Sequence, residues 1–249
     1  MKSSEYSVIY GDQDIVVLNK KSGYLVAADR YDTDSPRLDE AAEKEFGKLF
    51  AVHRIDTDAS GAVIYARNEK TQAELASQFQ NREVKRIFHC LVNGSPSWEN
   101  LHVDLKLLPD GDQRHRTTVN KKTGKIAVTD YKFICRCGPY SWIEAIPQTS
   151  RTHQVRVHLQ ENGVTIVCDP LYSGNQKPVR LSDIKKRWNG DADEERPLLS
   201  RLALHLYSIE ITHPSSGEKM LFEAPYQKDM DAVRKQLAKI FGGDPLSKA

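Results

Sequence analysis

The sequence predicts an α+β fold with a substantial antiparallel sheet. Short apolar runs rich in β-branched residues recur along the chain, each bounded by turn-forming residues, and helical periodicity is confined to a few segments between them. The expected elements do not follow the regular strand–helix alternation of a parallel sheet. With 249 residues the chain can bury a sizeable core, and we expect a single domain over residues 1–249.

In the first half of the chain, strands are indicated by β-branched runs and helices by apolar residues recurring every three or four positions. Asn68 is a suitable helix N-cap, and Gly23 ends an apolar run. The expected elements are two strands within 6–23 separated by a turn at 11–14, a helix over 37–50, a strand over 62–66 and a helix over 69–80.

The second half follows the same logic. Thr152 is expected to cap a helix that Gly163 stops, and Gly94 is expected to end a strand. The expected elements are strands over 86–94, around 126–135 and over 141–147, a helix over 152–163, a last strand over 205–212 with a turn after it, and a helix over 228–241.

Composition narrows the class of protein. The formal net charge is only +2, so bulk charge does not by itself indicate nucleic-acid binding. The four cysteines form no C-x-x-C pair and the N-terminus is not signal-like, which predicts a reduced, cytoplasmic protein. No apolar stretch approaches the length of a membrane span.

Two polar segments are expected to project from the core. Residues 110–125 are basic, and residues 173–197 have a basic half followed by an acidic half. Such runs are often solvated surface loops. They are also suited to contact phosphates, in which case Trp188 could stack on a base instead of pinning its own loop.

The segment HRIDTDASG (53–61) places an arginine and two carboxylates directly before the strand expected at 62–66. Charged groups held near a core must be paired, hydrogen-bonded or open to a cleft. The segment is therefore either a site where a carboxylate does chemistry or a surface turn rich in Asp, Ser and Gly.

Metal sites do not fit this sequence. Asp56-x-Asp58-x-Ser60-Gly61 copies the first half of a calcium loop, but the twelfth position, which needs a bidentate Glu, is Arg67. Cys135 and Cys137 have the wrong spacing for a zinc site, and the sequence offers no second cluster of zinc ligands beside them.

Two hydrolytic readings stay open from the residues alone. Asp56 and Asp58 could act as paired carboxylates, although positions so close in a loop give no predictable separation. A ribonuclease could use His53, His153 and His158, although histidines near helices and strand ends are more often structural.

Five separated stretches favour another assignment. They read VIYGDQDIVVLNKKSG, AVHRIDTDASGAVIYARN, KRIFHCLVNG, SRTHQVRVHLQENGVTIVCDPLYSG and RLALHLYSIEITHPSSGEKMLFEAP, and they run from about residue 7 to about residue 226. In order and approximate spacing they resemble the motifs of the RluA-type RNA pseudouridine synthases, and HRIDTDASG is the most specific of them. The resemblance implies a pseudouridine synthase catalytic domain with a mixed, mainly antiparallel sheet and a central cleft flanked by helices.

The resemblance also implies the reaction and its residues. These enzymes detach uracil from ribose, turn it and rejoin it through carbon, without a cofactor or metal. Asp56 matches the essential aspartate, acting as nucleophile at the anomeric carbon or assisting a glycal-type intermediate. Arg156 matches the arginine that opposes it. Arg54 is expected to enter the RNA where the base was or to contact a phosphate.

Phe88 is the main departure from the family pattern. The family usually has tyrosine there, packed against the uracil; phenylalanine keeps the aromatic face but has no hydroxyl. Lys21, Ala59 and Ser150 replace the usual proline, threonine and glycine of their motifs. None of these changes removes a charged catalytic group, so an active enzyme is favoured over a silent RNA-binding protein on the same scaffold.

The expected partner is structured RNA, a ribosomal or transfer RNA stem-loop, because a loop base costs less to extrude than a base in a duplex. Many family members carry a small helical RNA-binding domain before the catalytic one, whereas this chain begins in the catalytic motifs. Recognition is therefore expected in the 110–125 and 173–197 segments, and the expected state is a monomer. A hydrolase of nucleosides or RNA would need a positioned water that no motif identifies.

Overall fold

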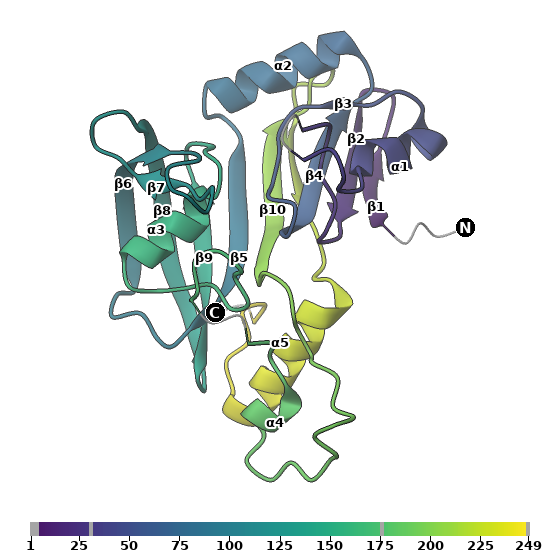
Figure 1. Ribbon diagram of the computed structural model, residues 1–249. Coiled ribbons are helices and arrows are strands. Elements are labelled where there is room, and N and C mark those ends of the chain that lie inside the picture. The colour runs from purple at the N-terminus through teal and green to yellow at the C-terminus, as the bar shows by residue number, and fades with distance from the viewer. Residues whose placement is uncertain (1–4, 30–31, 175–176, 248–249) are drawn as a thin grey trace. The chain divides into compact units, whose positions relative to one another are not determined.

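The computed structural model describes residues 5–29, 32–174 and 177–247 (Figure 1). The chain forms two compact units. The first comprises the chain up to Phe88 together with His205–Pro225, and the second comprises His89–Leu204 together with the chain from Tyr226 onward. The chain crosses from one unit to the other three times: within β5 (Lys85–Asn93), within β10 (Leu204–Thr212), and between Pro225 and Tyr226, after the last strand. The single catalytic domain expected over residues 1–249 stays a prediction.

The first unit is a small sheet with two helices. Its strand order is β1-β2-β4-β10, with β3 paired to β4 and β11 paired to β10. The β4–β10 pair is parallel and the other pairs are antiparallel. The bounds, besides those of β10, are β1 (Tyr6–Gly11), β2 (Ile15–Lys20), α1 (Leu38–Phe46), β3 (Phe50–Ala51), β4 (Ser60–Ala66), α2 (Glu69–Gln80) and β11 (Lys219–Glu223).

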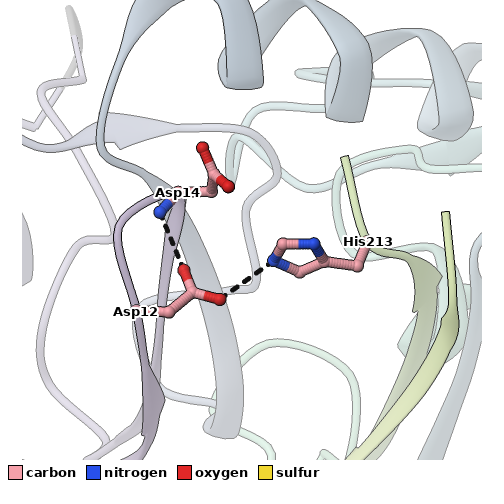
Figure 2. Close-up of side chains that lie close together, drawn as sticks. All are labelled: Asp12, Asp14 and His213. Atoms are coloured by element: carbon pink, nitrogen blue, oxygen red, sulfur yellow. Dashed lines mark hydrogen bonds and ion pairs between the residues drawn. The ribbon is translucent and has the colours of Figure 1, made fainter. Parts of the chain in front are cut away.

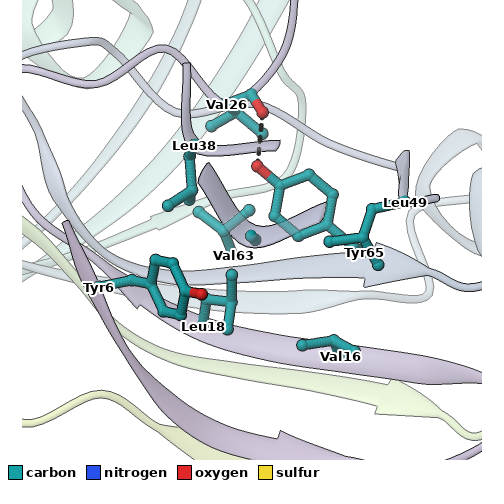
Figure 3. Packing of buried hydrophobic residues seen from close by; sticks show 9 residues of the cluster. Tyr6, Val16, Leu18, Val26, Leu38, Leu49, Val63 and Tyr65 are labelled. Atoms are coloured by element: carbon teal, nitrogen blue, oxygen red, sulfur yellow. Dashed lines mark hydrogen bonds between the residues drawn. The ribbon is translucent and has the colours of Figure 1, made fainter. Parts of the chain in front are cut away.

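The core of the first unit lies between β1, β2 and β4 on one side and α1 with its flanking loops on the other (Figure 3). All residues of β2 and β4 are buried, which accords with the short apolar runs at 15–18 and 62–66. The Tyr65 hydroxyl donates to the carbonyl oxygen of Val26 at 2.5 Å, so the ring of this core tyrosine also fixes the loop after β2.

The second unit has the strand order β5-β9-β8-β6-β7. The pairs β6–β7, β6–β8 and β8–β9 are antiparallel. Helix α3 packs on this sheet through Val157, which joins Leu107, Ala127 and Tyr172 in one buried cluster. The bounds are β6 (Asn100–Leu108), β7 (Thr118–Val119), β8 (Lys125–Cys137), β9 (Tyr140–Pro147), α3 (Gln154–Glu161), α4 (Leu181–Ile184) and α5 (Lys228–Phe241).

Most expected elements are present, with corrections at their ends. Helix α2 spans 69–80 as expected, and Asn68 Oδ1 accepts the N–H of Thr71 at 2.8 Å. Helix α1 ends at Phe46 instead of residue 50, because Gly47 leaves the helical conformation with φ 74°.

Two further expectations were wrong. Thr152 does not cap α3: the N-cap is His153, which takes a left-handed φ of 54° and makes no side-chain cap hydrogen bond. The strand over 205–212 is not the last, because β11 follows it across the turn at 213–218. The sequence reading also missed β6, in which charged residues alternate with buried ones because one face of the strand is open to solvent.

The two polar segments are braced by hydrogen bonds. In the 110–125 segment, Arg116 pairs with Asp112. In the 173–197 segment, whose residues 175 and 176 lie outside the described residues, Glu195 accepts from the backbone and hydroxyl of Ser182. The acidic half therefore braces the basic half. The Trp188 ring lies against Gly190, where an added Cβ would come within 2.5 Å of it, which accords with a tryptophan that pins its own loop.

Among the residues that the structure describes, no helix is both long and apolar enough to cross a bilayer.

Candidate active site

Asp56 lies at the centre of the loop between β3 and β4, in the first unit, and is half-buried. The preceding residue, Ile55, packs against the core of this unit. The following residue, Thr57, is held through its carbonyl oxygen, which accepts from Gly23 N at 2.8 Å and from Lys20 Nζ at 2.9 Å. Both neighbours of Asp56 are therefore fixed to the scaffold.

Lys20 is the unusual member of this arrangement, since it is fully buried. Its ammonium group also donates to the carbonyl oxygens of Lys21 at 3.1 Å and Tyr24 at 2.7 Å. An ammonium group has three N–H donors, and these carbonyl oxygens offer it three acceptors. Through these hydrogen bonds Lys20 connects the loop after β2 to the Asp56 loop. The sequence analysis singled out the neighbouring Lys21 and missed Lys20.

The end of the Asp56 loop is fixed where β4 meets β10. Gly61 has φ 121°, and an added Cβ would lie 2.3 Å from the carbonyl oxygen of Leu206, so only glycine fits. The Ser60 hydroxyl contacts His205 Nδ1 at 2.8 Å, and His205 Nε2 contacts the carbonyl oxygen of Ala224 at 2.9 Å. Because a carbonyl only accepts, Nε2 carries the proton and Nδ1 accepts from Ser60.

His53, at the start of the loop, is a structural residue. Its Nε2 accepts the backbone N–H of Ile64 at 3.0 Å, and its ring stacks on Phe79. Burial, assisted by the nearby Arg86 cation, lowers the pKa of His53 to about 3, so the imidazole is neutral near pH 7. These contacts do not suit the acid–base role that a ribonuclease would require of it.

The two other candidate histidines lie in the second unit. His158 is fully buried, its Nδ1 contacts Thr129 Oγ1 at 3.1 Å, and burial lowers its pKa to about 4 although Asp104 acts in the opposite sense. His153 Nδ1 contacts the hydroxyl of Tyr172 at 3.0 Å. Both rings are engaged in contacts within the protein.

Arg54 and Phe88 lie in the first unit with Asp56. The Arg54 side chain is 62% exposed, and its Nη1 lies 2.8 Å from Asp29 Oδ2. An exposed arginine held by one surface carboxylate can exchange that partner for another anion. Phe88 is buried in β5 and is the last residue of the first unit before the chain enters the second.

Arg156 lies in the second unit, on α3, with a side chain that is 2% exposed. Asp169 holds it in a two-point pair, with Nε to Oδ2 at 2.8 Å and Nη2 to Oδ1 at 2.7 Å. The guanidinium carbon lies 5.1 Å from the centre of the Tyr172 ring. The sequence reading missed Asp169 and Tyr172, although the stretch CDPLY places an acid and an aromatic shortly after the helix.

One group of side chains among the described residues has the composition of a metal site: Asp12, Asp14 and His213, whose ligand atoms lie within 4.8 Å of one another. Figure 2 shows Asp12 between the backbone of Asp14 and the His213 ring, with contacts of 2.7 and 2.9 Å. Burial raises the pKa of Asp12, but hydrogen bonds from Ile15 N–H and its other donors outweigh it and lower the pKa. The Asp12 carboxylate is thus already hydrogen-bonded by protein donors, and its contact with His213 joins the turn at 11–14 to the turn at 213–218.

Comparison with known proteins decides the family. Residues 14–161, more than half of the chain, match the RNA pseudouridylate synthase family. The chain belongs to this family. The prediction made from the five sequence stretches is thereby confirmed.

Individual relatives agree with the family assignment. The chain is 32% identical over 235 residues to ribosomal large subunit pseudouridine synthase D of Neisseria meningitidis serogroup B, covering 90% of this chain but only 59% of that protein. It is 31% identical over 219 residues to dual-specificity RNA pseudouridine synthase RluA of Escherichia coli K12, covering 88% of this chain and 92% of that protein. The chain thus spans less than two thirds of the Neisseria relative and nearly all of the other.

Solved structures confirm the fold of this family member. Human RNA pseudouridylate synthase domain containing 4 superimposes with a TM-score of 0.70 at 19% identity, covering 93% of this chain and 92% of that one. Human RNA pseudouridylate synthase domain containing 1 also gives 0.70, at 20% identity, covering 98% and 91%. The expected α+β pseudouridine synthase fold is therefore correct.

Proposed function

We propose that this protein is an RNA pseudouridine synthase that converts specific uridines in structured RNA to pseudouridine. Family membership and the names of its relatives support the activity. The observation that carries the proposal is the Asp56 loop, in which a half-buried carboxylate lies between two residues fixed to the scaffold. A catalytic group needs such fixation, because a small misplacement costs a large factor in rate.

Asp56 is the proposed nucleophile. The reaction is an isomerisation in which the N1–C1′ bond of uridine breaks and a C5–C1′ bond forms. C5 loses a proton and N1 gains one, so atoms and charge balance without a cofactor. The carboxylate either adds to C1′ as uracil leaves or assists formation of a glycal-type intermediate.

Three further residues have proposed roles. Arg156 is the cation that favours the ionised form of Asp56, since an opposed charge lowers the cost of a carboxylate in a partly desolvated site. Arg54, exposed and held only by Asp29 among the contacts described, engages the RNA as the uridine leaves its stack. Phe88 supplies an aromatic face for the uracil.

The proposed substrate is a stem-loop of ribosomal or transfer RNA. The name of one relative, a ribosomal large subunit synthase, supports ribosomal RNA, and the name of the other, a dual-specificity RNA synthase, supports RNA in general. We further propose that the protein acts as a cytoplasmic monomer. A second candidate function is a silent RNA-binding protein. It is favoured by Phe88, which has no hydroxyl to take part in proton transfer, and by the departures from the family motifs at Lys21, Ala59 and Ser150.

The test compares the wild type with Asp56→Ala and with Asp58→Ala as a matched control in the same loop. RNA from cells lacking the protein is incubated with each and mapped for pseudouridine by chemical labelling. We expect a new site with the wild type and with Asp58→Ala, and a loss on the order of 10⁴-fold with Asp56→Ala. If the wild type binds RNA but produces no pseudouridine at any position, the protein is a silent binder.

A further inference from the structure

We propose that Asp169 is a positioning residue for the isomerisation: it holds the guanidinium of Arg156 in the one orientation that the reaction uses. The inference rests on the proposed function and extends it to a residue that touches neither RNA nor the reacting atoms. It concerns only contacts within the second unit.

The pair between Asp169 and Arg156 uses one whole edge of the guanidinium. Nε and Nη2 each donate to a different carboxylate oxygen, at 2.8 and 2.7 Å. Two parallel hydrogen bonds fix the plane of the guanidinium as well as its position. Any further partner of Arg156 must therefore bind at Nη1 or at the second hydrogen of Nη2, on the opposite side of the group.

The Asp169 carboxylate is itself immobile. It is completely buried, and Oδ1 also accepts the backbone N–H groups of Leu171 at 2.9 Å and Tyr172 at 3.1 Å. The turn over residues 169–173 is further stabilised by Ser173, whose hydroxyl donates to the carbonyl oxygen of Asp169 at 2.6 Å. Rotation of the carboxylate would break several hydrogen bonds at once, so it is a rigid support.

Tyr172 supports the guanidinium from its face. The ring centre lies 5.1 Å from the guanidinium carbon, a distance at which a cation and an aromatic ring attract. The Tyr172 hydroxyl accepts the N–H of Thr117 at 2.9 Å and donates to its carbonyl oxygen at 3.2 Å. The turn that holds Arg156 is thereby also fixed to the basic 110–125 segment.

The consequence of this support is kinetic. A free arginine side chain samples many rotamers, and ordering it during the reaction would cost conformational entropy. Asp169 orders it beforehand. Without that restraint the guanidinium would shift by on the order of 1 Å, and a displacement of that size lowers a rate by about 100-fold.

A purely structural role is the competing explanation, because breaking a buried ion pair destabilises a fold. The chain contains a second pair for comparison, although the side chains of Arg201 and Asp229 are 16% and 36% exposed, against 2% and 0% for Arg156 and Asp169. Arg201 and Asp229, also in the second unit, form the same two-point arrangement with contacts of 2.6 and 2.7 Å. Asp229→Asn should cost stability and leave kcat unchanged.

The experiment is a double-mutant cycle on pseudouridine formation with full-length protein and an RNA that the wild type modifies. The variants are Asp169→Asn, Arg156→Met, their combination, and Asp229→Asn. We expect Asp169→Asn to lower kcat about 100-fold with the KM for RNA nearly unchanged. In the Arg156→Met background, the same change should lower kcat no further, because there is no guanidinium left to orient.

Asp169→Glu covers the case in which Asp169→Asn does not fold, since it retains the charge but moves it by one methylene. It should lose about tenfold in kcat, less than the amide variant, because a carboxylate still pairs with Arg156. The inference is overturned if the folded variant at position 169 retains the wild-type kcat, or if the effects of the two substitutions multiply. A wild type that modifies no RNA would instead overturn the proposed function, and this inference with it.

Discussion

Replacing Gly61 by alanine tests how the Asp56 loop is fixed to its scaffold. Gly61 stands at the start of β4, where this strand runs parallel to β10 beside Leu206. Its φ of 121° is outside the regions that residues with a side chain adopt, and an alanine Cβ would point at the backbone of the neighbouring strand. The change therefore combines backbone strain with a steric clash.

The magnitude follows from the geometry. Backbone strain at such a position costs about 1–3 kcal/mol. The Cβ would lie 2.3 Å from the oxygen, 2.5 Å from the nitrogen and 2.7 Å from the carbonyl carbon of Leu206. All three are backbone atoms, so no rotamer change relieves the clash, and overpacking adds about 1–3 kcal/mol. The total of about 2–6 kcal/mol is a large share of the 5–15 kcal/mol that stabilises a typical protein.

The assay is urea unfolding followed by circular dichroism, with Gly217→Ala as the matched control in the same unit. Gly217 has φ 72° and no atom within 4 Å of an added Cβ, so alanine there carries backbone strain alone, about 1–2 kcal/mol. The difference between the two variants measures the steric part together with any extra backbone strain at the φ of 121°. Pseudouridine formation should fall only in the Gly61 variant, because only that strand end carries the Asp56 loop.

Equal losses of stability in the two glycine variants would refute this reasoning. They would mean that β4 and β10 separate at little cost and that their close approach does not hold the loop. A Gly61→Ala variant with wild-type stability would refute it more strongly.

Two further predictions concern pH and RNA binding. The pKa of His53 is about 3 in the folded protein against 6.5 when unfolded, so the unfolded state binds more protons between these values and stability falls as pH decreases through this window. The variant His53→Gln, whose side chain can still accept the N–H of Ile64, should reduce the loss of unfolding free energy between pH 6.5 and 4.5 by about 2–3 kcal/mol. An unchanged pH profile of urea unfolding would contradict this. In the 173–197 segment, three basic side chains are exposed: Lys185, Lys186 and Arg187. Replacing all three by alanine should weaken RNA binding and reduce the slope of log association constant against log salt concentration by about 2–3. An unchanged slope would show that these side chains do not contact the RNA.

The sequence by itself determined the local structure and the family. Helix α2 could be predicted to the residue, because its cap and its apolar spacing are formed by neighbours along the chain. Strands β2 and β4 could be recognised because each contains a short run of apolar residues, several of them β-branched. The Asp56 loop was identified because its residues are contiguous.

Only the tertiary structure decided which partners hold the functional residues. Ser60 meets His205 across 145 positions of sequence, and Lys20 reaches Thr57 across 37. Arg156 could be singled out from its motif, but its pair with Asp169 depends on a turn whose backbone N–H groups orient the carboxylate. His153 replaced the expected Thr152 as the cap of α3 through a left-handed backbone. Periodicity and capping reflect interactions between near neighbours, whereas these pairings arise only when distant segments pack.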